Sequence, residues 1–243
     1  MDRETRHQLK QDEFKDTLVQ VEEYLKQNYK QIVNIAIVVI VVIGLGGGLK
    51  YYTDRQNAAA NTDLGEALAT FQAYVGQPTP EQNPAPGATY ATAQEKYKKA
   101  LQQFDAILTK YRMPPQPKAV AIARYQSGVC QSLLDDHKGA ILTLTEASQE
   151  GDADIAALAK FALAGELAKT GKAADAVKLY DELANHPTLS VPKASALLAM
   201  ADAYRESQPA KAREIYERVE KEFASSPSIA QAVRQNMATL TPQ

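Results

Sequence analysis

Residues 161–187 read FALAGELAKTGKAADAVKLYDELANHP, and this stretch contains the pattern that decides the fold. Small and apolar residues return at helical spacing on both sides of a break at Gly171 and Lys172. Ala176 follows the break by about one helical turn, and Tyr180 follows four residues later on the same face. We therefore expect a helix, a tight turn and a second helix.

The same arrangement recurs with a period of 36 residues. Three alanines lie 36 residues apart: Ala140, Ala176 and Ala212. A large residue follows each of them by four positions: Leu144, Tyr180 and Tyr216. The upstream helices have a small residue at corresponding places: Gly128, Ala164 and Ala201. An earlier half-unit, Ala100 with Phe104, lies 40 residues before the first pair, and the segment 113–117 (MPPQP) absorbs the extra length.

These spacings predict an all-α domain over residues 88–243, built as a solenoid of stacked helix pairs. Small residues let paired helices approach closely, while the large residue fills the gap to the next unit. No unit can bury its apolar face alone, so neighbouring units must stack. Alanine supplies much of the 45% hydrophobic content, which also favours helices over sheet. An irregular helical bundle is the alternative interpretation.

The unit resembles the tetratricopeptide repeat. Ala164, Gly171, Ala176 and Tyr180 stand at that family's small, glycine, alanine and aromatic positions, and Pro187 closes the unit. The chain departs from the family pattern because it has no tryptophan, and the turn before Ala212 is one residue short. The resemblance implies a helical-repeat fold whose first helices line a concave face.

Residues 32–49, IVNIAIVVIVVIGLGGGL, contain no charged side chain. These 18 residues would form roughly 27 Å of helix, close to the hydrocarbon thickness of a bilayer. Tyrosines and lysines flank both ends, as at membrane interfaces: Tyr24, Tyr29 and Lys30, then Lys50, Tyr51 and Tyr52. We predict a transmembrane helix over residues 32–52. A cleavable signal peptide fits less well because a charged segment of about 30 residues comes first.

The glycines at the end of this span suggest a contact with another membrane helix. Gly44 and Gly48 have the small-xxx-small spacing of closely packed membrane helices. The alternative is that glycine is simply common in such spans.

Basic residues predict the orientation of the chain. The segment 1–31 has six Lys and Arg residues, whereas only Lys50 and Arg55 follow the span closely, so the N-terminus is expected in the cytoplasm. Phe14, Leu18, Val21 and Leu25 form one stripe, which predicts an amphipathic tail or a solvated extension of the membrane helix. Residues 53–87 are expected to form a juxtamembrane helix followed by a proline-rich loop.

The residue pattern predicts no catalytic, cofactor or metal site. His7, His137 and His186 are scattered, and no His-x-x-x-His or Cys-x-x-Cys pair could hold zinc. Asp135 and Asp136 are interpreted as a helix-ending turn, and Cys130 as a small buried hydrophobe rather than a nucleophile. A net charge of −2 argues against nucleic acid as a partner. We therefore expect a protein that is not an enzyme, without a small-molecule substrate.

Protein binding is the favoured function. Tyr125, Phe161 and Leu198 occupy equivalent positions on the first helices, with Asp202 and Arg205 nearby. We expect these five residues to line a groove for an extended peptide or a partner helix. The alternative is that the apolar stripe packs between neighbouring units.

The whole architecture resembles the YfgM-type ancillary subunits of the bacterial Sec translocon. The residues that match are Lys50-Tyr51-Tyr52 after the span and the alanines of the repeat. The segment 212–223 also resembles units of envelope proteins such as the cell-division coordinator. The first resemblance implies an inner-membrane protein with a periplasmic C-terminal domain, and partners that are the translocon and a membrane-anchored periplasmic chaperone. The alternative is a scaffold for envelope or secretion machinery without translocon contact.

Overall fold

The computed structural model describes residues 3–76 and 89–240, with the side chains of residues 24–31, 33–76 and 89–240. The chain is mostly helical, and it divides into two compact units, Met1–Arg55 and Gln56–Gln243. The second unit therefore begins earlier than the repeat domain expected from residue 88. The predicted proline-rich loop lies almost entirely outside the described residues.

The first unit consists of a helix that continues into the second. Helix α1 (Arg3–Gln72) runs without interruption through the predicted tail, span and juxtamembrane segment. Within the described part of the chain, α1 is the one helix long and apolar enough to cross a membrane, and its apolar window is not buried at all. A Cβ added to Gly44 or Gly48 would have no heavy atom within 4 Å, so the glycine face is open. The orientation stays a prediction.

The second unit contains the end of α1 and eight further helices among the described residues. Two short strands precede them, β1 (Tyr74–Val75) and β2 (Thr89–Tyr90). The helices are α2 (Ala93–Lys110), α3 (Lys118–Leu133), α4 (His137–Ala147), α5 (Ala153–Lys169), α6 (Ala173–Asn185), α7 (Lys193–Tyr204), α8 (Pro209–Glu222) and α9 (Pro227–Ala238). The strands pair in parallel, Tyr74 with Thr89 and Val75 with Tyr90. The sequence predicted an all-α domain and gave no indication of this strand pair.

The 36-residue period reappears in the backbone. Helices α4, α6 and α8 begin at His137, Ala173 and Pro209, each 36 residues after the previous one. Asp135 and Gly171, also 36 residues apart, both have positive φ, of 62° and 81°. Such a left-handed residue ends a helix and reverses the chain. The next turn is built differently, because Ser207, 36 residues after Gly171, does not have a positive φ.

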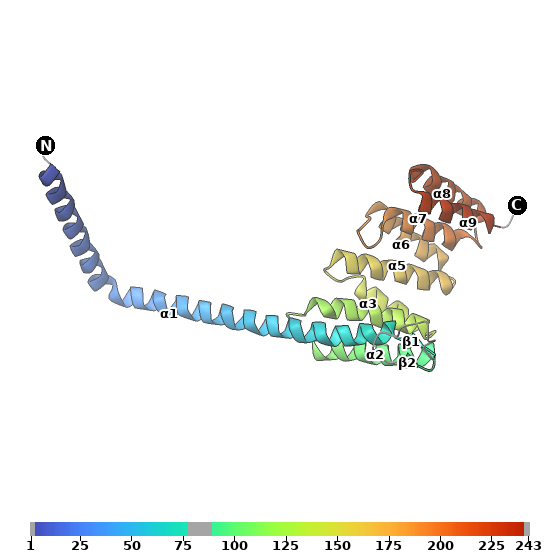
Figure 1. Ribbon diagram of the computed structural model, residues 1–243, viewed down its shortest axis with the longest axis horizontal. Coiled ribbons are helices and arrows are strands. Elements are labelled where there is room, and N and C mark those ends of the chain that lie inside the picture. The colour runs from blue at the N-terminus through green and yellow to red at the C-terminus, as the bar shows by residue number, and fades with distance from the viewer. Residues whose placement is uncertain (1–2, 77–88, 241–243) are drawn as a thin grey trace, which may run out of the picture. The chain divides into compact units, whose positions relative to one another are not determined.

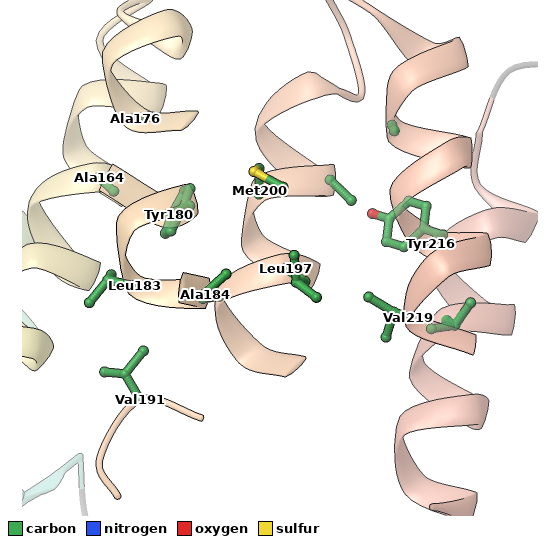
Figure 2. Packing of buried hydrophobic residues seen from close by; sticks show 14 of the residues in the cluster. Ala164, Ala176, Tyr180, Leu183, Ala184, Val191, Leu197, Met200, Tyr216 and Val219 are labelled. Atoms are coloured by element: carbon green, nitrogen blue, oxygen red, sulfur yellow. The ribbon is translucent and has the colours of Figure 1, made fainter. Parts of the chain in front are cut away.

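The repeated residues of the pattern form the core. The alanines at the repeated position are fully buried: Ala100, Ala140, Ala176 and Ala212. The large residues four positions later are also buried: Phe104, Leu144, Tyr180 and Tyr216. Figure 2 shows Tyr180, Met200 and Tyr216 on successive helices of the larger core cluster. Close packing requires the small residues, because a Cβ on Gly128 would lie 2.7 Å from the Leu144 side chain.

Each helix from α2 onward packs on the next one in the chain, and Figure 1 shows them in chain order from green α2 to red α9. Contacts also join the odd-numbered helices: α3 with α5, α5 with α7, and α7 with α9. Even-numbered helices have no comparable contact with one another among the described residues. The odd-numbered helices therefore approach one another along one side of the stack.

Local capping explains where several helices begin. Asp152 accepts hydrogen bonds from the backbone amides of Asp154 and Ile155 at the start of α5. Asp136 accepts one from the amide of Gly139 at the start of α4, and Thr92 one from Glu95 at α2. These side chains satisfy amides that have no partner inside the helix. The Asp135-Asp136 turn predicted from the sequence is confirmed.

Candidate functional site

A cavity of about 290 Å³ opens between α3, α4, α5 and α6. We call it the aromatic cavity and define it by six of its lining residues: Tyr125, Val129, Leu144, Phe161, Gly165 and Tyr180. The ring of Phe161 meets that of Tyr180 edge to face, with 5.3 Å between centroids. Edge-to-face contacts are a favourable arrangement of aromatic rings. The wall of the aromatic cavity is therefore largely apolar and includes a packed pair of aromatic rings.

Tyr125 and Phe161, two of the five residues predicted to line a groove, both line this cavity. Both side chains are half-buried. Phe161 also packs against the larger core cluster, and Tyr125 packs against the small cluster around Ala140 and Leu144. The two residues therefore line a cavity and pack between helices at the same time.

A second hollow, of about 700 Å³, lies between α5 and α7. We call it the polar hollow and define it by Ala168, Lys169, Gly171, Asp202, Arg205 and Glu206. Lys169 lines both spaces, so the polar hollow adjoins the aromatic cavity. The structure therefore places Asp202 and Arg205 next to the cavity that contains Tyr125 and Phe161.

Asp202 and Arg205 are also bound to the core. The hydroxyl of Tyr216 donates a hydrogen bond to Asp202, and Arg205 Nη2 donates to Asp202 Oδ1 at 2.5 Å. The hydrogen bond with Tyr216 raises the pKa of the Arg205 guanidinium. Burial, followed by the bond to Asp202, raises the pKa of Tyr216 to about 12. Asp202 therefore accepts hydrogen bonds from both Tyr216 and Arg205, whereas the Nε of Arg205 is buried without a hydrogen-bond partner among the described residues.

Leu198 is separate from the other four predicted residues. It is half-buried and packs against the larger core cluster. It is absent from the lining of both the aromatic cavity and the polar hollow. Two pairs of predicted residues are thus brought to adjoining spaces, and Leu198 is not.

A buried carboxylate that the sequence analysis missed lies in the wall of the aromatic cavity. The side chain of Glu166 is only 3% exposed. It accepts hydrogen bonds from Ser132 and from Lys169 Nζ (2.7 Å), and contacts His137 Nδ1 at 2.8 Å. Burial alone would raise the pKa of Glu166, but the bonds from Lys169, Ser132 and His137 outweigh it and lower the pKa. A sequence signal existed, because Glu166 and Lys169 lie 36 residues before Asp202 and Arg205.

The hydrogen bonds around Glu166 are arranged to link helices and not to activate a nucleophile. Ser132 donates its hydroxyl to Glu166, and His137 contacts the other carboxylate oxygen. A nucleophilic serine would instead be paired with the imidazole. Glu166 therefore joins α5 to the end of α3 and the start of α4.

Cys130 is buried, as expected, and burial raises the pKa of its thiol to about 12. A thiol that stays protonated is a poor nucleophile. In the part of the chain that the structure describes, no three His, Cys, Asp or Glu side chains lie together as a metal site would require.

Comparison with known proteins gives no match to this chain, whether with protein-family models, with curated sequences or with solved structures.

Proposed function

We propose that this chain is a membrane-tethered protein-interaction module, and that the side of the odd-numbered helices receives the partner. The observation that supports this best is the pair of adjoining spaces along α3, α5 and α7. One is apolar and aromatic, the other polar, and Lys169 borders both. Concave sites with an apolar wall and a few polar groups are typical of binding sites.

We further propose that the helix pairs form a tetratricopeptide-like solenoid. The 36-residue spacing of the starts of α4, α6 and α8 supports this interpretation. The contacts among odd-numbered helices support it as well, because a curved stack brings one set of helices together on its inner side. The aromatic cavity and polar hollow would then lie on the concave face.

The resemblance to YfgM-type subunits suggests which partners to test. On this proposal α1 spans a bacterial inner membrane with the N-terminus in the cytoplasm, and the second unit lies in the periplasm. The translocon and a membrane-anchored periplasmic chaperone are the proposed partners. A scaffold of envelope or secretion machinery is the alternative, with the same interaction surface and different partners.

Site-specific photo-crosslinking in membranes tests the surface. A photoreactive phenylalanine replaces Tyr125 in the full chain, and a matched control replaces Leu142, which is 65% exposed on α4 and lines neither space. We expect a crosslinked partner from position 125 and none from position 142. Equal crosslinking from both positions, or none from 125, would contradict the proposal.

The identity of the crosslinked partner separates the two versions of the function. Translocon or chaperone subunits would support the first, and envelope-assembly proteins alone would support the scaffold. A reporter enzyme that is active only outside the cytoplasm, fused after Gln243, tests the orientation. An inactive reporter on a full-length fusion that is present in the membrane would place the C-terminal domain in the cytoplasm and overturn the proposed partners.

A further inference from the structure

The second unit begins close to the apolar stretch of α1. That stretch ends at Leu49, and α1 continues as a helix to Gln72. Gln56, the first residue of the second unit, follows Leu49 by seven positions, or roughly 10 Å of helix. The headgroup layer on each side of a bilayer is about 5 to 7 Å thick. If the apolar stretch spans a membrane, the chain therefore enters the second unit just outside the headgroups. We call the part of the second unit around Gln56 the entry end.

The loop between α2 and α3 lies at the entry end. Near the start of α2, the ring of Tyr97 packs against Phe71 of α1, with 5.6 Å between centroids. At the end of α2, Lys110 Nζ and the Tyr111 hydroxyl donate hydrogen bonds to Asp63 of α1, at 2.7 and 2.9 Å. Helix α2 therefore runs antiparallel to the last part of α1, and the chain leaves α2 towards the entry end.

This loop, residues 112–117, combines an exposed apolar side chain with an unpaired cation. Met113 is 68% exposed. Arg112 is exposed too, and its side chain forms no ion pair with any residue that the structure describes. On either side, Lys110 and Lys118 have side chains that are 57% and 83% exposed, although each pairs with an aspartate. An apolar side chain among basic ones is typical of segments that lie in a membrane interface.

The other highly exposed apolar residue on a loop of the second unit lies at the same end. Lys118 Nζ pairs with Asp152 at the start of α5, at 2.8 Å. Asp154, in the first turn of α5, accepts a hydrogen bond from the Ser190 amide at 3.1 Å, so the loop between α6 and α7 is also at this end. Leu189 in that loop is 94% exposed. Among the described residues, the turns at the opposite end contain no large hydrophobic residue with comparable exposure.

We propose that the loop 112–117 rests in the headgroup layer of the bilayer that α1 spans, with Met113 inserted among the lipids and Arg112 bound to lipid phosphates. This inference rests on the membrane tether of the proposed function. An arginine guanidinium can bind a phosphate through two parallel hydrogen bonds. Methionine is flexible and apolar, and it adapts to irregular surroundings. The contact gives the second unit a second point of attachment, which limits its rotation about α1.

Fluorescence quenching in nanodiscs tests this contact. The full chain is placed in nanodiscs of phosphatidylcholine and phosphatidylglycerol that include a lipid with a spin-label quencher on its headgroup. A fluorophore is attached to Gln116→Cys, at an exposed position in the loop, or to Ser207→Cys, at an exposed position in a turn at the opposite end. Cys130 is buried, so it should take up no label. We expect quenching at position 116 and none at position 207, relative to nanodiscs without the quencher.

Two substitutions with matched controls separate contact from proximity. Arg112→Gln should lower the ratio of bound to unbound loops about 5-fold, the effect of one basic residue near an anionic surface. Met113→Ser should lower this ratio about 5-fold or more, because apolar burial is lost. Arg213→Gln on α8 and Leu142→Ser on α4 replace similarly exposed residues elsewhere and should leave the quenching unchanged. All four variants should keep the Tm within about 2 °C, since their side chains lie at the surface.

Two results would overturn the inference: equal quenching at positions 116 and 207, or quenching at position 116 that Arg112→Gln or Met113→Ser leaves unchanged. Either result, in chains that co-purify with nanodiscs, would leave the membrane tether of the proposed function standing. Failure of the chain to co-purify with nanodiscs would overturn the tether and this inference together.

Discussion

Replacing Glu166 by glutamine should destabilise the second unit by about 2 kcal/mol. The substitution keeps the shape of the side chain and removes its charge. The side chains of Lys169 and His137 are 59% and 42% exposed, so water can replace much of their interaction with Glu166. Each of these two interactions therefore contributes about 0 to 1 kcal/mol, as surface ion pairs do. The bond from Ser132 is more protected. Glutamine can still accept it, but a bond to a charged group contributes about 1.5 to 3 kcal/mol and a neutral one about 0.5 to 1.5, so about 1 kcal/mol is lost there.

Urea unfolding of the full chain, followed by far-UV circular dichroism, measures this difference. Glu217→Gln is the matched control because Glu217 is exposed on α8, and its change should stay within about 0.5 kcal/mol. A change below about 0.5 kcal/mol for Glu166→Gln at pH 7 would refute the view that Glu166 ties α5 to the preceding helix pair.

The pH dependence gives an independent check with a defined sign. The pKa of Glu166 is lower in the folded chain than its ordinary value of 4.5, so its contribution is fully present above that value. It is lost as the pH falls through the lowered pKa. The stability difference between the unsubstituted chain and Glu166→Gln should therefore be largest at neutral pH and shrink below about pH 4.5. A difference that grows on acidification would contradict this.

Three further predictions concern other parts of the chain. Cys130, with a pKa of about 12, should resist iodoacetamide at pH 8 and become alkylated only after unfolding in urea, as mass spectrometry would show. Asp152→Ala should lower the Tm by about 2 to 4 °C, because α5 loses the acceptor for two amides and Lys118 loses its ion-pair partner; an unchanged Tm would show that water replaces the cap. Val41→Lys, near the middle of the apolar stretch, should disfavour membrane insertion by about 3 kcal/mol and increase extraction by alkaline carbonate; unchanged extraction would argue against a spanning helix.

Periodicity in the sequence predicted the helices well, because it reports directly on which residues are buried. The alanines at 36-residue spacing are all buried, and the Asp135-Asp136 turn and the burial of Cys130 are confirmed. The helical-repeat solenoid and the direction of the span stay predictions. No break in α1 separates the predicted tail, span and juxtamembrane segment. The four glycines at positions 44 and 46–48 do not interrupt the helix.

The sequence did not predict those features of the site that depend on the direction in which a side chain points. The sequence alone could not show that Glu166 reaches back to Ser132 and His137 rather than forward to Tyr180. A comparison of Asp202 and Arg205 with the residues 36 positions earlier would have raised the question without answering it. Phe161 and Leu198 stand three residues before Ala164 and Ala201 respectively, yet Phe161 lines the aromatic cavity and Leu198 does not.

The neighbour-to-neighbour packing of the second unit also determines how it opens. Helix α9 contacts α7 and α8, and Val233 is its one buried residue among those described. Little free energy therefore holds α9 in place, and its departure would leave α5 and α6 untouched. In hydrogen–deuterium exchange, the amide hydrogens of α9 should exchange first and those of α8 next. The amide hydrogens of α5 and α6 should exchange most slowly. Fraying of this kind would start at the C-terminal end and stop before it reached the aromatic cavity.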